Sequence, residues 1–193
     1  MTGRRGPGRA ALAALLLAAG LALLGQAGSI RAKGLLAQAL LERAFARSLA
    51  AGGRPVRPWP WADTVPVARL TLLGRSLVAL DASSGQALAF GPGHVPGTPE
   101  AGEPGTAVYA AHRDLHFRGL DRLRTGDPVA VTRRDGVRLR FRVTGTRVVR
   151  HDASGIDPHA PGRRLVLATC WPLDGATRGP LRLLVEAALI PGE

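Results

Sequence analysis

The chain contains a single cysteine, Cys170, at the end of an apolar run that begins at Leu165. A lone cysteine excludes an internal disulfide and a four-thiolate zinc site, and leaves an inert, dimer-forming or reactive thiol. In a strand, alternation would place Ala168 and Cys170 on one face and Leu167 and Thr169 on the other, so the thiol need not face the large leucines. A nucleophilic thiol also needs a proton acceptor and a group that stabilises negative charge.

His112 is the histidine best placed to accept that proton, because it follows the apolar run 106–111 as Cys170 follows its own. Imidazole exchanges protons near neutral pH. His112 and His116 also have the four-residue spacing of a helical metal pair. The glutamate and the third ligand of the zincin pattern are missing, so we expect no metal. Asp114 is a second-rank candidate, as a carboxylate that would orient His112.

Arg182 is the candidate for stabilising negative charge, since it stands inside the otherwise apolar run 180–185. Alternation would put Arg182 on the outer face, beside the strand that ends at Cys170. A surface ion pair with Glu186 is the alternative, but residues four apart on a strand are separated by roughly 13 Å. A guanidinium keeps its charge and offers forked donors that suit an oxyanion or a carbonyl. Arg178, in the loop before this run, is the competing candidate.

The elements that must position these residues have a period of two. The clearest is Val137–Val143, where every second residue is apolar and each intervening one is Arg. Seven further short runs are expected as strands: 67–73, 77–80, 106–111, 128–132, 147–150, 164–169 and 181–189. About eight short strands joined by Gly, Pro and Asp turns, without long intervening helices, predict an all-β fold, either a closed barrel or a sandwich.

Length and composition limit the other functions. The 193 residues, 46% hydrophobic, suit one folded domain with an appendage. The net charge is +12, and every cation except Lys33 is an arginine. The arginines form no dense cluster, and aromatic residues make up only 4%, which argues against nucleic-acid binding. No glycine-rich phosphate loop is present, so no nucleotide cofactor is expected.

The amino terminus is expected to be a membrane anchor over residues 1–30. Three arginines precede an apolar run from Ala10 to Gly25, and about 20 apolar residues span a bilayer. The charge balance predicts that the rest of the chain is exported. A cleaved signal peptide is the alternative, with small residues at Gly25 and Ala27 for a signal peptidase. Residues 31–62 are expected to form a helical stalk and a Pro-rich linker, and residues 63–193 the globular domain.

Three segments together resemble the sortases, the membrane-anchored cysteine transpeptidases of bacteria. Leu167–Cys170 looks like their Thr-Leu-x-Thr-Cys strand end, Val108–Asp114 looks like their histidine segment, and Leu181–Val185 looks like their arginine strand. The order histidine, cysteine, arginine agrees as well. The best subgroup match is the type found in Gram-negative bacteria. Ala111 stands where sortases usually have glycine, which adds a methyl group beside the imidazole.

The resemblance implies a closed eight-stranded β-barrel and a thioester mechanism. Cys170 would attack a carbonyl, His112 would serve as general acid and base, and Arg182 would hold the oxyanion. Thr169, Ala168 and Arg178 would contact the substrate, although a plain strand-forming role suits Thr169 equally well. No cofactor and no metal are expected.

The resemblance also implies partners and a location. The substrate would be a protein with a Leu-Pro-x-Thr-Gly-like C-terminal sorting signal, and an amine would accept the acyl group. The protein would be a single-pass protein of the inner membrane with its barrel on the periplasmic side. The alternative is a non-catalytic, membrane-tethered barrel that binds an envelope peptide or polymer.

Overall fold

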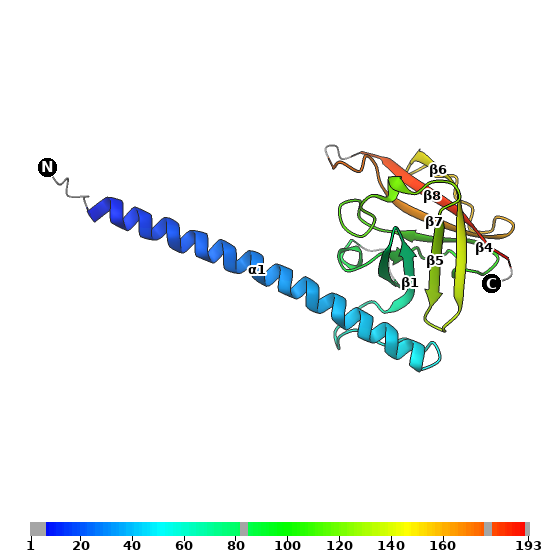
Figure 1. Cartoon of the computed structure of the whole chain (residues 1–193), viewed down its shortest axis with the longest axis horizontal. Coiled ribbons are helices and arrows are strands. Elements are labelled where there is room, and N and C mark those ends of the chain that lie inside the picture. The colour runs from blue at the N-terminus through cyan, green and yellow to red at the C-terminus, as the bar shows by residue number, and fades with distance from the viewer. Residues whose placement is uncertain (1–6, 82–84, 176–178, 192–193) are drawn as a thin grey trace. The chain divides into compact units, whose positions relative to one another are not determined.

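Within the residues that the structure describes, 7–81, 85–175 and 179–191, eight strands close into one barrel (Figure 1). The structure is a computed structural model. Around the barrel the strands follow the order β1-β2-β3-β4-β7-β8-β6-β5. Their bounds are Pro66–Leu72 (β1), Arg75–Leu80 (β2), Gly93–His94 (β3), Gly105–Ala110 (β4), Pro128–Arg133 (β5), Arg138–Arg150 (β6), Arg163–Cys170 (β7) and Leu181–Leu189 (β8). The prediction of an all-β, eight-stranded closed barrel is confirmed.

The division into strands differs from the prediction in two places. The expected strands 137–143 and 147–150 form one 13-residue strand, β6, whose register against β8 shifts between Val143 and Gly145. Such a bulge bends a strand and interrupts its alternation, which explains why the sequence shows two runs. The eighth strand is instead β3, whose two residues pair parallel with β2 and antiparallel with β4. His94 is the second residue of this strand.

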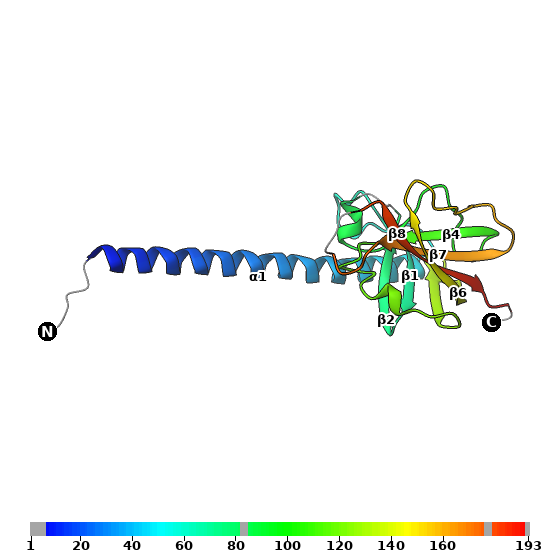
Figure 2. The same ribbon diagram turned by 90° about the horizontal axis from the view of Figure 1, so that it is seen from above.

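The two faces of β7 and β8 bury different clusters. The inner cluster fills the barrel and includes Tyr109, Phe117, Phe141, Leu165, Leu167, Leu183 and Val185. The outer cluster consists of Val108, Val166 and Leu184, with Val95, Val149, Ile156 and Ala168 packed against it. The alternation expected for both strands is therefore confirmed. Figure 2 shows β4, β7 and β8 as neighbours in one wall of the barrel, in agreement with their pairing.

Two compact units make up the chain, residues 1–39 and 40–193, and helix α1 (Pro7–Ala50) belongs to both. Its last turns are part of the second unit, because Leu41 and Phe45 are buried against Val78 and Leu80 of β2. The helix ends at Ala50, and in the turn that follows, the positive φ of Gly53 lets its N–H donate to the carbonyl of Ser48 at 2.9 Å.

The proline-rich segment after the helix lies partly on the barrel. Trp59 packs edge-on against Phe90, with 5.5 Å between ring centroids, whereas Trp61 is exposed. Among the helices formed by the described residues, none combines the length and the apolar character that a membrane span requires. The membrane anchor predicted for residues 1–30 is therefore not confirmed.

Candidate active site

Cys170 and Arg182 face each other across two neighbouring strands. Cys170 is the last residue of β7, Arg182 is the second of β8, and the antiparallel register pairs them directly. Directly opposed residues have Cβ atoms roughly 5 Å apart and project on the same face. Both side chains are half-buried on the outer face of the barrel. The Arg182 Nη1 donates to the carbonyls of Leu181, at 2.8 Å, and of Gly179, at 3.3 Å.

His112 approaches Cys170 from the other side of β7. Strand β4 runs parallel to β7, with Ala110 opposite Ala168, and the Ala111 N–H donates to the Ala168 carbonyl at 3.1 Å. Continuing this register by two residues brings His112 level with Cys170. Because the barrel order is β4-β7-β8, the segment that carries His112 and the strand that carries Arg182 lie on opposite sides of β7.

Thr169 links the two segments from inside the barrel. Its hydroxyl donates to the carbonyl of Ala111 at 2.7 Å, and only 3% of the residue is exposed. The methyl group of Ala111, the residue that stands where glycine is usual, is itself buried in the inner cluster. Thr169 therefore fixes the residue before His112 to the residue before Cys170. Its hydroxyl is engaged inside the barrel, away from the face that carries the thiol.

The other residues expected at the site have different surroundings. Ala168 is half-buried in the outer cluster on the outer face of β7. Its pair with Leu184 is the next one on this face after the pair of Cys170 with Arg182. Asp114 is exposed. Arg178 lies outside the described residues.

Arg113 is a site residue that the sequence reasoning missed. Its guanidinium Nη1 donates to the Pro172 carbonyl at 2.7 Å, and Nη2 donates to the Gly175 carbonyl at 3.3 Å. Arg113 thus joins the segment that carries His112 to the loop that follows Cys170. Because Arg113 directly follows His112, the sequence could have marked it as a candidate site residue. The sequence does not show which carbonyls its guanidinium reaches.

His116 lies four residues beyond His112 and is half-buried. Burial lowers the pKa of its imidazole, and the positive charges of Arg75 and His112 lower it further, against a raising effect of the Ala89 carbonyl that its Nε2 contacts at 3.4 Å. No group of three His, Cys, Asp or Glu side chains in the described part of the chain is placed to hold a metal ion.

The barrel matches one known protein family. A model of the sortase domain matches residues 67–190. No curated protein matches the chain. Sortase E from Streptomyces avermitilis, solved as a point mutant, shares 27% identity over 65% of this chain and 87% of its own, with a TM-score of 0.55. The pilus-related sortase C of Group B Streptococcus shares 26% identity over 65% of this chain and 68% of its own, with a TM-score of 0.57.

A third solved structure is similar to this chain in its fold. Sortase A from Corynebacterium diphtheriae shares 20% identity over 81% of this chain and 85% of its own, with a TM-score of 0.61. The family match covers the whole barrel from β1 to β8, including the strand that ends in the half-buried thiol. The chain therefore belongs to the sortase family and is a cysteine transpeptidase.

Proposed function

We propose that Cys170 is the nucleophile of this transpeptidase, with His112 as general acid and base and Arg182 as the group that stabilises the oxyanion. The observation that carries the proposal is the register that pairs Cys170 with Arg182 on the outer face. The parallel pairing of β4 with β7 supports the role of His112, because it carries the histidine along the other side of the same strand.

The reaction has two steps. The Cys170 thiolate attacks the carbonyl carbon of the scissile peptide bond, the carbon–nitrogen bond breaks, and the His112 imidazolium gives its proton to the leaving amine. An incoming amine then attacks the thioester and loses a proton to His112, and the sulfur leaves as thiolate. In both tetrahedral intermediates the oxyanion forms beside β8, where the guanidinium of Arg182 can donate to it.

The substrate in this proposal is a protein with a Leu-Pro-x-Thr-Gly-like C-terminal sorting signal. Ala168 supports it, because a small side chain one residue pair before the thiol leaves room for a peptide on the outer cluster. Thr169 acts from inside the barrel by holding the backbone before His112, and Arg178 would reach the peptide from the loop before β8. The Gly179–Arg182 segment and the Trp171-Pro172 pair after the thiol favour the Gram-negative type of sortase.

We further propose that residues 1–30 tether the protein to the inner membrane with the barrel on the periplasmic side. The support is the run of apolar residues between Ala10 and Gly25 behind three arginines. Alkaline carbonate extraction of cell membranes tests it: a tethered chain stays in the pellet at full length. A soluble chain that begins near Gly28 would overturn the tether in favour of a cleaved signal peptide.

Mass spectrometry of the full chain, incubated with a library of sorting-signal peptides, tests the chemistry. A single cysteine makes the assignment direct, because a thioester adduct has only one thiol to form on. We expect an acyl adduct in the wild type that an added amine discharges, and none in Cys170→Ala. No adduct with any peptide, together with a thiol that resists alkylation until the chain unfolds, would instead support the non-catalytic barrel.

A further inference from the structure

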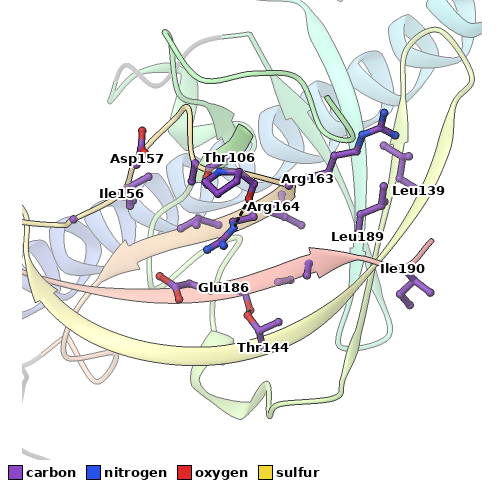
Figure 3. Close-up of a pocket in the computed structure, with 18 of the residues that line it drawn as sticks. Thr106, Leu139, Thr144, Ile156, Asp157, Arg163, Arg164, Glu186, Leu189 and Ile190 are labelled. Atoms are coloured by element: carbon purple, nitrogen blue, oxygen red, sulfur yellow. Dashed lines mark hydrogen bonds between the residues drawn. The ribbon is translucent and has the colours of Figure 1, made fainter. Parts of the chain in front are cut away.

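The cavity drawn in Figure 3 lies on the outer side of the barrel and has a volume of about 1160 Å³. Strands β6, β7 and β8 line it together with the segment 155–162, which precedes β7. Val166 and Leu184, both buried in the outer cluster, lie between this cavity and Cys170. The cavity is therefore separated from the thiol, and a volume of this size accepts ligands of many classes without identifying one.

A second cavity, of about 240 Å³, is much more restrictive. It lies between the start of β1, the end of β5 and the loop that joins β3 to β4, and its lining consists of Val67, Asp81, His94, Pro96, Gly97, Glu100, Tyr109, Arg133 and Arg134. A water molecule in the liquid takes about 30 Å³, so the cavity has room for about eight waters or for one small molecule.

Tyr109 brings a buried hydroxyl group to this cavity. Only 2% of the residue is exposed, and the ring of His94 packs against its ring with 5.2 Å between centroids. No hydrogen bond joins the hydroxyl to another residue of the described chain. Burial raises its pKa well above the usual range, and the negative charge of Glu100 raises it further, against a lowering effect of Arg133. The hydroxyl is therefore protonated at neutral pH and can donate to a ligand in the cavity.

Arg133 adds a second polar atom without a partner. Its Nη2 lies 3.1 Å from a carboxylate oxygen of Glu100 and 2.6 Å from one of Asp135, and its Nη1 donates to the Ala101 carbonyl at 3.4 Å. Its Nε is buried and has no hydrogen-bond partner among the residues that the structure describes. Because an unpaired buried donor is costly, an acceptor group in the cavity would stabilise this arrangement.

The charged groups around the cavity have both signs. Arg134 is half-buried, and its ion pair with Glu100 is long, at 3.8 Å. Asp81 is exposed and forms no ion pair within the described part of the chain. A simple anion would meet the carboxylates of Asp81 and Glu100, and a simple cation would meet two guanidinium groups. A small molecule that carries both charges is the complement of this lining.

We propose that this cavity binds a free α-amino acid with a small side chain. The carboxylate of the ligand accepts from the Tyr109 hydroxyl and from the Nε of Arg133, and its ammonium group pairs with the Asp81 carboxylate. The volume of about 240 Å³ excludes a peptide of several residues.

The proposed site is separate from the candidate active site. Tyr109 belongs to the inner cluster and pairs with Leu167, whereas Cys170 lies on the outer face, at the end of the same strand β7. A ligand beside Tyr109 is therefore neither the acyl donor nor the amine that attacks the thioester. The inference goes beyond the proposed function and does not rest on it.

The test uses the hydroxyl itself as the probe. Tyr109 is the only tyrosine of the chain, so the full-length protein with isotope-labelled tyrosine Cζ gives one NMR signal. The ligands are glycine, alanine and serine, and the matched controls are propionate and ethylamine, which lack the ammonium or the carboxylate group of alanine. At constant ionic strength we expect a saturable shift with an amino acid, with a Kd on the order of 1 mM, and at least tenfold weaker binding of both controls.

A pair of variants locates the binding. Asp81→Asn should weaken amino-acid binding at least tenfold, whereas Asp63→Asn, which removes the same charge from an exposed residue outside the lining, should leave it unchanged. A signal that moves with none of the three amino acids would show that the cavity holds water only and would overturn the inference. Propionate or ethylamine binding as tightly as the amino acid, or two variants that bind alike, would overturn it as well. None of these results bears on the proposed function, because the thiol takes no part in the measurement.

Discussion

Replacing Thr169 by valine exchanges one hydroxyl for a methyl group and changes almost nothing else. The hydroxyl donates to the Ala111 carbonyl at 2.7 Å from a residue that is 3% exposed, so water cannot take its place. A lost neutral hydrogen bond costs about 1 kcal/mol, and a buried acceptor left without a donor raises the cost to about 2 kcal/mol. For a domain of this size the melting temperature should fall by about 4–8 °C.

Activity should respond as well, because Ala111 precedes the proposed base. Freed from Thr169, the backbone before His112 can shift relative to Cys170, and misplaced acid–base groups slow a reaction steeply. We expect kcat/KM for acylation of Cys170 to fall at least tenfold in Thr169→Val. Thr169→Ser is the matched control: it keeps the donor, loses one buried methyl group worth about 1 kcal/mol, and should retain most of the activity.

Thermal unfolding and the acylation rate, measured on the same three proteins, decide between the explanations. If Thr169→Val melts and reacts like the wild type, the hydrogen bond does not hold the two segments together. If Thr169→Ser is as slow as Thr169→Val, a retained hydroxyl does not preserve the activity, and the hydrogen bond alone does not account for the effect.

Two further predictions concern the surroundings of the site, and a third concerns the start of β4. Arg113→Ala removes the hydrogen bond to the Pro172 carbonyl and should lower kcat about tenfold, while the melting temperature stays within about 2 °C of the wild type. Arg113→Lys should restore part of the lost kcat. A change in KM without a change in kcat would contradict this prediction. Burial lowers the pKa of His116 in the folded state, so as the pH falls the unfolded chain protonates this imidazole before the folded chain does. The free energy of unfolding should therefore decrease as the pH drops below about 6.5. Urea titrations at several pH values should show a smaller decrease in His116→Gln. Gly105→Ala should lower the free energy of unfolding, measured by thermal unfolding, by more than about 2 kcal/mol, since φ is +111° and a Cβ would lie 2.2 Å from the Pro158 oxygen. Gly145→Ala is the control and should be tolerated better, because no atom lies within 4 Å of the added Cβ.

The sequence was sufficient to predict which face each strand residue occupies. Alternation depends only on the backbone, so the placement of Cys170 and Arg182 opposite the large inner leucines followed from their positions in two apolar runs. The β-barrel followed from the number of short strands and the absence of long helices between them, together with the family resemblance.

Contacts that depend on distant loops could not be predicted. The bonds from Arg113 to the carbonyls of Pro172 and Gly175 require the loop after Cys170 to return over the histidine segment, which no local pattern encodes. The packing of Phe45 against β2 was missed for the same reason, because apolar residues every four or five positions fit an isolated stalk as well as a docked helix.

The topology of the sheet explains why three residues far apart in sequence meet at one edge. Parallel pairing of β4 with β7 brings their carboxyl ends together, which carries His112 to the level of Cys170, and antiparallel pairing of β7 with β8 brings the start of β8 to the same edge, with Arg182. A slip of one residue in β7 would turn the thiol inward and Thr169 outward. Adjacent residues therefore have opposite tasks: the outward thiol is free to react, and the inward hydroxyl fixes the strand whose end carries the proposed base.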